Sequence, residues 1–138
     1  MTAVNVDWAP LALRLILGIL FIAHGYPKLK NLKGTASWLA SIGFRPGIFW
    51  ALVLSITELG GGIAILAGLA VRIASALLIV AMAIATLLKA FKWKMPFTKM
   101  SEGAGYEFDL VILAGLIALL FLGAGNWSVD QMIGWIVG

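Results

Sequence analysis

The sequence contains no cysteine, and this absence excludes several kinds of chemistry at once. Without a thiol the chain cannot form a structural disulfide, a dithiol relay, a thiolate metal site or a cysteine-ligated iron–sulfur cluster. Its one histidine, His24, cannot supply two histidine ligands to a haem, and the groupings of histidine and carboxylate that mark other metal sites are missing. We therefore expect no haem and no metal, so that any chemistry must use acids, bases or a bound organic cofactor.

Motifs of soluble enzymes are missing as well. The sequence has no glycine-rich phosphate loop, no dinucleotide fingerprint and no nucleophile elbow, and we predict no bound flavin. Charged residues make up only 12% of the chain, with 10 lysines and arginines against 6 acidic residues. The basic residues are not interleaved with aromatic ones on a soluble face, so we do not expect nucleic acid as a partner.

Long apolar runs are present instead, because 62% of the residues are hydrophobic. The runs cover residues 8–26, 48–69, 73–88 and 106–123, and each has about the length that crosses a hydrocarbon core of roughly 30 Å. They are continuous rather than alternating, which favours helices over a β-barrel. We predict a single all-α domain over residues 1–138, an integral membrane four-helix bundle whose first run is retained rather than cleaved as a signal peptide.

The segment after the first run contains residues that break helices and residues that form them. Pro27 and the region of Gly34 are predicted to end the first helix. Residues 35–43 then follow the pattern of a short amphipathic helix, which either lies in the headgroup region or plugs the cytoplasmic mouth of the bundle. Near the end of the chain, Ser128 and Asp130 are predicted to cap a last short helix.

The basic residues are concentrated in two of the connections between runs. The first connection carries Lys28, Lys30, Lys33 and Arg45, and the third carries Lys89, Lys92, Lys94 and Lys99. The positive-inside rule predicts that both connections are cytoplasmic. Both termini, which carry Asp7 and Asp130, then face outward from a multi-pass protein of the cell membrane. The basic loops are expected to contact anionic membrane lipids.

Two charged side chains lie deep inside the apolar runs. Arg14 is about six residues into the first run, roughly 9 Å deep at 1.5 Å per residue, and snorkelling to the outer headgroups is one explanation for it. Glu58 lies near the centre of the second run, so it must be paired, protonated or facing a polar cavity. Because the two runs are antiparallel, we predict an ion pair between Arg14 and Glu58.

Four further polar residues are expected at the cytoplasmic ends of the runs. His24 and Lys28 lie at the end of the first run, and Glu107 and Asp109 begin the fourth. The two acids lie about 200° apart on a helix, so only one of them points fully into the bundle. The residues that share the face of Glu107 are smaller, and we predict that Glu107 points inward. Compensation of a helix dipole is the alternative role for both acids, and an interfacial hydrogen bond is the alternative for His24.

At these positions the chain resembles the DoxX family of small four-helix membrane proteins. The resemblance covers nearly the whole chain and rests on the order and spacing of Arg14, Gly18, Phe21, His24, Gly25, Lys28, Leu29, Glu58, Gly61, Gly62, Gly68, Arg72, Met82, Tyr106, Glu107, Gly123, Gly125, Ser128 and Asp130. It implies a membrane subunit linked to quinone-dependent oxidation, as in thiosulfate:quinone oxidoreductases and an archaeal terminal oxidase complex. For some members it also implies partners in oxidative-stress and thiol metabolism.

A quinone head group needs hydrogen-bond donors near its carbonyl oxygens and a group that exchanges protons. We assign quinone or quinol binding to Arg14, Lys28, His24 and Glu58, and proton exchange to Glu58, His24 and Glu107. The chain has no redox metal ligands of its own, so reducing equivalents pass to or from a redox partner protein. We therefore expect a membrane subunit rather than a self-contained enzyme.

Two other classes of function remain open. A carboxylate buried near the bilayer midplane, such as Glu58, is also what a proton-coupled carrier or a channel uses. Such a carrier is expected to work as a homo-oligomer, because four short helices enclose little space. The third class is an assembly scaffold, in which the buried polar residues only fix the register of the helices.

Overall fold

The computed structural model describes residues 8–98 and 105–135. Every regular element within these ranges is helical, and in chain order the elements are α1 Trp8–Lys30, α2 Leu32–Ser41, α3 Gly47–Ala67, α4 Val71–Leu87, the π-helical turn η1 Leu88–Lys92, α5 Glu107–Leu122 and α6 Val129–Met132. The predicted all-α class is therefore confirmed for the described residues. The predictions that concern Asp7 and Lys99 lie outside them.

Three helices are long and apolar enough to cross a membrane: Trp8–Lys30, Gly47–Ala67 and Val71–Lys92, the last of which combines α4 and η1. α5 has 16 residues, or about 24 Å of helix, and is shorter than these three. Large apolar side chains are exposed along the helices, for example Ile16 on α1 and Phe121 on α5. A surface of this kind fits a lipid environment rather than water.

The first helix does not end at Pro27. α1 continues past Pro27 to Lys30, because the missing N–H of a proline interrupts one hydrogen bond of the helix and leaves the others in place. The Asn31 amide still donates to the Pro27 carbonyl at 2.9 Å. The Asn31 side chain then caps α2 by accepting from the Gly34 N–H at 3.2 Å. The predicted break at Pro27 and Gly34 is therefore wrong, and the short second helix begins at Leu32 rather than at residue 35.

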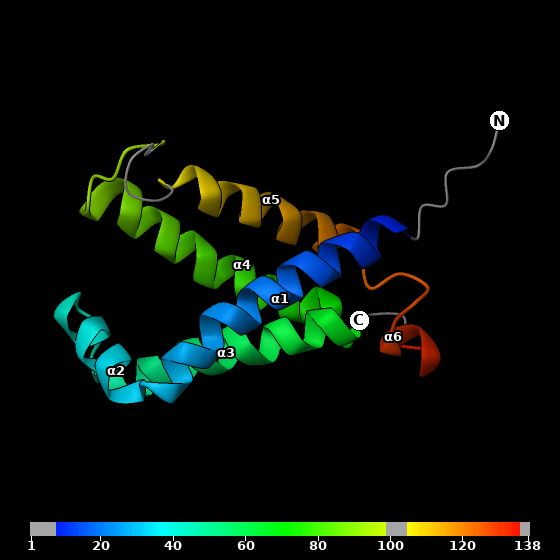
Figure 1. Ribbon diagram of the computed structural model, residues 1–138, viewed down its shortest axis with the longest axis horizontal. Helices are drawn as coiled ribbons and strands as arrows, with labels where there is room; N and C mark the ends of the chain where they lie inside the picture. The colour runs from blue at the N-terminus through cyan, green and yellow to red at the C-terminus, as the bar shows by residue number, and fades with distance from the viewer. Residues whose placement is uncertain (1–7, 99–104, 136–138) are drawn as a thin grey trace.

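α1 and α3 lie side by side with their backbones in contact (Figure 1). Glycines allow this approach. A Cβ on Gly25 would lie 2.5 Å from the Leu59 nitrogen, and a Cβ on Gly62 would lie 2.9 Å from the Ile22 nitrogen. Small residues are the usual means by which membrane helices pack closely. α4 and α5 form the second closely packed pair.

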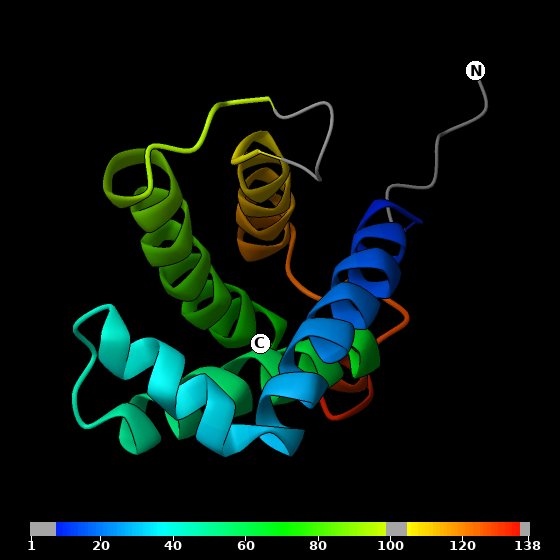
Figure 2. The same cartoon turned by 60° about the vertical axis from the view of Figure 1, so that its left-hand side comes forward.

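The two helix pairs meet at one end of the molecule and separate toward the other (Figure 1 and Figure 2). We call the end that carries α6 the α6 end, and the opposite end, which carries α2, the α2 end. At the α6 end a tight turn joins α3 to α4, with Gly68 at φ 76° and Ala70 at φ 48°. The most deeply buried apolar side chains lie where the pairs meet, and they include Phe21, Ile65, Leu78, Leu116 and Leu119.

Two polar residues near the carboxyl end fix the α6 end. The Ser128 hydroxyl accepts from the Gln131 N–H at 3.2 Å, so Ser128 caps α6 as predicted. Asp130 caps a different helix from the one predicted. Its carboxylate accepts from the N–H groups of Ala70 and Val71, at 2.7 Å and 3.3 Å, and thereby caps the first turn of α4.

Candidate functional site

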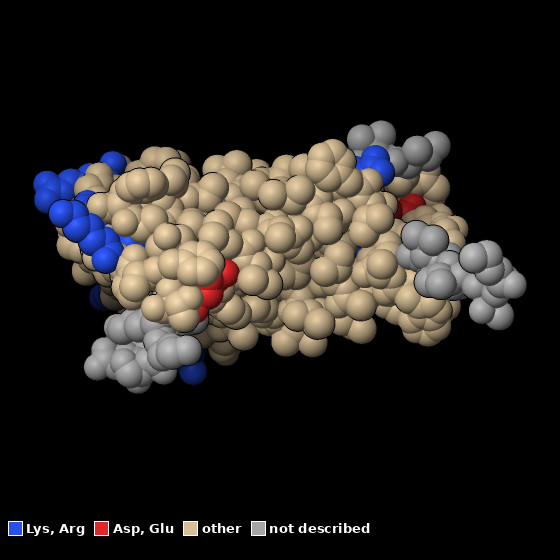
Figure 3. Space-filling view, turned by 90° about the horizontal axis from the view of Figure 1, so that it is seen from above, with Lys and Arg blue, Asp and Glu red and all other residues tan. Residues whose placement is uncertain are grey.

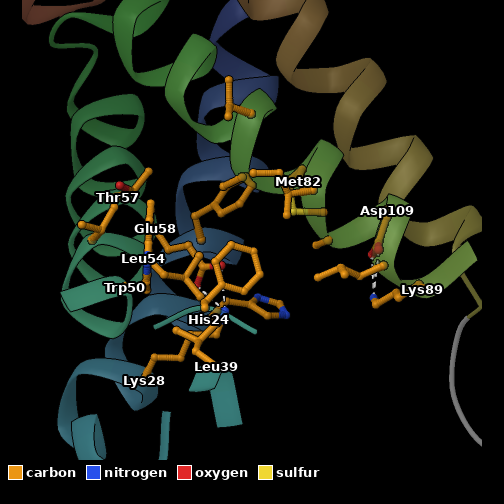
Figure 4. A pocket seen from close by; sticks show the side chains of 18 of the residues that line it. His24, Lys28, Leu39, Trp50, Leu54, Thr57, Glu58, Met82, Lys89 and Asp109 are labelled. Atoms are coloured by element: carbon orange, nitrogen blue, oxygen red, sulfur yellow. Dashed lines mark hydrogen bonds and ion pairs between the residues drawn. The ribbon is translucent and has the colours of Figure 1, made fainter. Parts of the chain in front are cut away.

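A cavity of about 460 Å³ lies between the two helix pairs at the α2 end (Figure 4). Its volume is within the range of small-molecule binding sites, roughly 300–1,000 Å³. Residues of all the helices from α1 to α5 contribute to the wall, which is largely apolar and contains the aromatic rings of Phe21, Trp38, Phe44, Trp50, Trp93 and Phe108. The polar side chains of the wall are His24, Lys28, Thr57, Glu58, Lys89 and Asp109. The cavity is therefore an apolar chamber with a small number of charged groups.

The first of two ion pairs joins α1 to α3. Lys28 Nζ donates to both carboxylate oxygens of Glu58, at 2.7 Å and 2.6 Å. The Glu58 side chain is 9% exposed and that of Lys28 is 30% exposed, so the carboxylate is withdrawn while the ammonium group stays accessible. A buried carboxylate among apolar helices requires such a partner. The close helix contact at Gly25, one turn before Lys28, brings the two side chains together.

The predicted ion pair between Arg14 and Glu58 is wrong. The contacts of α1 with α3 set the register of the two helices, in which Gly25 lies against Glu58 and Arg14 lies against Gly68. Arg14 and Gly25 are eleven residues apart in the sequence, which corresponds to about 16 Å along the helix. This distance exceeds the reach of an arginine side chain, and Lys28 pairs with Glu58 instead.

Arg14 forms a buried link among backbone carbonyls at the α6 end. Its guanidinium group donates to the carbonyls of Ile65 and Leu66, in the last turn of α3, at 3.0 Å and 3.1 Å. It also donates to the carbonyls of Ala124 and Trp127, in the loop after α5, at 3.0 Å and 2.6 Å. The last carbonyls of a helix lack intrahelical partners, and a cation is favoured there by the helix dipole. Arg14 is not part of the cavity wall, and its contacts are those of a structural residue.

The second ion pair joins η1, which continues α4, to α5 across the cavity from the first. Lys89 Nζ lies 3.0 Å and 2.9 Å from the two carboxylate oxygens of Asp109. Asp109 is buried, whereas the Lys89 side chain is 31% exposed, which repeats the arrangement of Lys28 and Glu58. Figure 4 shows the two pairs on opposite sides of the cavity. Each helix pair thus contributes one lysine and one carboxylate.

The prediction that Glu107 rather than Asp109 points inward is wrong. Asp109 lies on the buried face of α5, together with Ile112 and Leu116. Val111 lies one turn after Glu107 on the same face of α5, opposite the face of Asp109, and it is 69% exposed. Val111 and Ala114, on the Glu107 side of α5, are exposed, so the small size of that face did not mark the inner side. Glu107 is half-buried and is not part of the cavity wall.

His24 adds a titratable group to the cavity wall. Its Nδ1 lies 2.7 Å from the carbonyl oxygen of Leu20, and because a carbonyl can only accept, Nδ1 carries the proton. This hydrogen bond is internal to α1. The ring is exposed, and Nε2 remains for a ligand or a proton. Figure 4 shows His24 close to the Lys28 and Glu58 side of the cavity.

Three of the five predicted site residues line the cavity, namely His24, Lys28 and Glu58, whereas Arg14 and Glu107 do not. Lys89 and Asp109 were not predicted from the sequence as site residues. One signal was available, because Lys89 follows an apolar run in the same way that Lys28 does. No comparable signal marked Asp109, because α5 is apolar on every side.

Comparisons with known proteins give one family and several relatives. The DoxX family model matches residues 9–90, which extend from α1 into η1. The chain is 33% identical over 123 residues to "Putative oxidoreductase CatD" of Bacillus subtilis strain 168, a match that covers 89% of this chain and 85% of that protein. It is 32% identical over 127 residues to "Inner membrane protein YqjF" of Escherichia coli K12, with 92% of this chain and 93% of that protein covered.

A third relative is "Uncharacterized membrane protein Rv3486" of Mycobacterium tuberculosis H37Rv. The chain is 29% identical to it over 133 residues, which cover 89% of this chain and 80% of that protein. No solved structure gives a significant match to this chain. The similarity to known proteins is therefore one of sequence, and it extends over most of the length of each relative.

Proposed function

Since the chain belongs to the DoxX family of membrane proteins, we propose that it is a membrane subunit of a quinone-linked oxidoreductase system. The cavity at the α2 end is the site at which quinone or quinol binds. One observation carries this proposal: an apolar, aromatic chamber is bordered by two lysine–carboxylate pairs and by His24. The name of the relative "Putative oxidoreductase CatD" supports an association with oxidoreductases.

The cavity wall fits both parts of such a ligand. A quinone combines a flat, largely apolar ring and tail with carbonyl oxygens that accept hydrogen bonds. The indole rings of Trp38, Trp50 and Trp93 offer flat apolar surface. Lys28 and Lys89 each have three N–H donors, and their carboxylates use only part of them. Each ammonium group can therefore donate to a ligand oxygen without leaving its carboxylate.

A bound quinone would supply redox chemistry coupled to the uptake and release of protons. The residues of this chain then have to exchange those protons. His24 has Nε2 on the side not used by the hydrogen bond to Leu20, and Glu58 and Asp109 are held beside the cavity by their lysines. The chain has no cysteine and one histidine, so a separate redox partner protein delivers or accepts the electrons.

The topology in the membrane is part of the same proposal. α5 is a fourth span, and the α2 end faces the cytoplasm. Lysine and arginine side chains gather at that end (Figure 3), and those in the described residues are Lys28, Lys30, Lys33, Arg45, Lys89, Lys92 and Lys94. The positive-inside rule places such an end in the cytoplasm, next to anionic lipids, and both termini outside. The name "Inner membrane protein YqjF" of a relative supports the cell membrane as the location.

Co-purification of quinone tests the proposal. The protein is purified gently from its native membrane, and quinone per protein is measured by mass spectrometry. We expect nearly one quinone per wild-type chain and about tenfold less in Glu58→Gln, because loss of the charge releases Lys28 from its position beside the cavity. Glu107→Gln is the matched control, since it removes the same charge outside the cavity wall, and it should retain quinone.

Two results would refute the quinone site. One is a wild-type protein that retains no quinone although the membrane contains it in abundance. The other is equal retention in wild-type protein and in Glu58→Gln, because the ligand would then bind somewhere other than beside the pair of Lys28 and Glu58.

A small-solute or proton-coupled carrier is the second candidate, because the carboxylates of Glu58 and Asp109 are both buried beside a cavity in apolar helices. Proton-coupled carriers use carboxylates in this setting. A carrier of this size would act as a homo-oligomer. Uptake into proteoliposomes driven by a pH gradient distinguishes it from the redox subunit. Flux that disappears in Glu58→Gln, in a protein that retains no quinone, would favour the carrier.

A further inference from the structure

A second, smaller cavity of about 230 Å³ lies at the α6 end, away from the proposed quinone site. Its wall is formed by Arg72, in the first turn of α4, and by the loop and short helix that follow α5. In contrast to the large cavity, this wall is mainly polar. Among the residues that contribute are Gly123, Ser128 and Gln131.

Arg72 brings to this wall a positive charge that forms no ion pair with the described residues. Its Nε is buried and has no hydrogen-bond partner among the described residues. Its Nη2 lies 3.5 Å from the Phe121 carbonyl oxygen, at the outer limit of a hydrogen bond. The ion pairs formed within residues 8–98 and 105–135 involve other side chains. Because an arginine carries five N–H donors, most of the donors of Arg72 are left unused by the described residues.

Arg72 has no evident structural role, because in the described part of the chain it neither caps a helix nor pairs with Asp130. A cation in the first turn of a helix is disfavoured by the helix dipole, so Arg72 does not stabilise α4 electrostatically. The carboxylate of Asp130 also borders the cavity, but it accepts from the Ala70 and Val71 N–H groups and is buried. Arg14 and Asp130 are opposite charges at the same end of the bundle. Among the described residues of this end, Arg72 is therefore the positive charge that has no opposite charge of its own.

The loop after α5 closes on the guanidinium group. Gly123 has φ 75°, and a Cβ on it would lie 3.3 Å from both Nε and Nη2 of Arg72. Trp8 and Trp127 pack edge to face nearby, with ring centroids 4.6 Å apart, and Trp135 is part of the cavity wall. Tryptophans concentrate at the level of the lipid headgroups in membrane proteins. The small cavity therefore lies at the depth at which phosphate groups are found.

We propose that this cavity binds a phosphate or a similar small oxyanion through the planar edge of Arg72, with the side-chain amide of Gln131 as a second donor. Arginine binds oxyanions through two parallel N–H bonds, which is the geometry that unused donors of one guanidinium group provide. The same chemistry has two sources, the phosphodiester of a lipid headgroup and free phosphate. The inference goes beyond the proposed quinone site, which lies at the other end, so either can fail without the other.

The test compares wild-type protein with Arg72→Gln and with the control Arg45→Gln. Arg45 is exposed near the α2 end, so its replacement removes the same charge without touching the small cavity, and any loss of lipid in Arg45→Gln measures the contribution of one basic residue of the α2 end. In the lipid arm, native mass spectrometry measures the retention of phosphatidylglycerol by protein in a neutral detergent. In the free-anion arm, Tm is recorded during titration with sodium phosphate at constant ionic strength.

If the source is a lipid, wild-type protein and Arg45→Gln retain phosphatidylglycerol about tenfold more strongly than Arg72→Gln. If the source is free phosphate, the titration raises Tm in the first two proteins and not in Arg72→Gln. Arg72→Lys, which keeps the charge and loses the planar edge, falls between them in whichever arm responds, and it replaces Arg72→Gln if that variant does not fold. Equal behaviour of all the folded variants in both arms would overturn the proposal.

Discussion

The two ends of the bundle use buried charge in different ways. At the α6 end, the side chains of Arg14 and Asp130 contact backbone groups of α3, of α4 and of the loop after α5. At the α2 end, lysine and carboxylate side chains contact each other beside a cavity of about 460 Å³. A charge bonded to the backbone cannot move without disturbing the helix end that it holds, whereas paired side chains can adjust to a ligand. The comparison teaches that the partner of a buried charge, rather than its burial, separates a structural role from a functional one.

Replacement of Arg14 by leucine is expected to have the largest effect, because it removes the link that holds the α6 end together. The variant leaves backbone carbonyls of α3 and of the following loop without a donor, and Asp130 without a compensating charge. We expect a loss on the order of 3–5 kcal/mol in stability, seen as a lower Tm and a poor yield of monodisperse protein. Quinone per folded molecule should not change. A stable Arg14→Leu protein that loses quinone would place Arg14 in the functional site and contradict the comparison.

The double variant Lys28→Met/Glu58→Leu replaces the first ion pair of the α2 end by apolar side chains of similar volume. Buried ion pairs replaced in this way commonly change stability by about 1–4 kcal/mol in the favourable direction or not at all, so Tm should be kept. Quinone retention should fall at least tenfold, because Lys28 as a donor and Glu58 as a titratable group are both gone. Thermal unfolding and quinone content are measured on the same preparation. Retained quinone and retained turnover with the redox partner would support the assembly scaffold instead.

The third prediction concerns the acid of α5 that faces the cavity, which is Asp109 and not Glu107. Asp109→Asn removes the charge that holds Lys89 at the cavity, and we expect about tenfold weaker quinone retention. Glu107→Gln should retain quinone as the wild-type protein does. Quinone content of the two variants, purified in parallel, checks this. The opposite ranking would mean that ligand binding rotates α5 so that Glu107 faces the cavity.

Ser128→Ala is expected to have the smallest effect on stability, and this effect should be limited to the α6 end. Loss of the hydroxyl that caps α6 typically costs about 1 kcal/mol. Tm should fall slightly, while quinone content stays at the wild-type level. A loss of quinone in this variant would show that the two ends are coupled, and the separation of roles drawn above would fail.

The helices were predictable from the sequence because a bilayer demands long, uninterrupted apolar segments. The predicted runs fall within a few residues of α1, α3, α4 and α5. The exception is the end of α1, where Pro27 was expected to stop the helix. Its actual end depends on the cap that Asn31 makes with Gly34, a local hydrogen bond that hydropathy does not report.

The partners of the buried charges were not predictable in the same way. The pairing of Glu58 with Lys28 follows from the register of α1 on α3, which the close contact at Gly25 sets to within a residue. The sequence provides only the approximate depth of each residue along its helix, and this depth was not accurate enough to predict the register. The inward acid of α5 was missed for a related reason. α5 is apolar on every side, so periodicity does not distinguish the core side from the lipid side.

Arg14 also joins parts of the chain that are synthesised at very different times. Its bonds to the Ala124 and Trp127 carbonyls span 110 and 113 positions of the sequence. During synthesis the first helix therefore enters the membrane with a charge whose later partners do not yet exist, which is a costly state in hydrocarbon. Arrival of the loop after α5 completes the set of acceptors. A chain interrupted before Ala124 consequently presents the quality-control machinery of the membrane with a helix that carries an incompletely paired arginine.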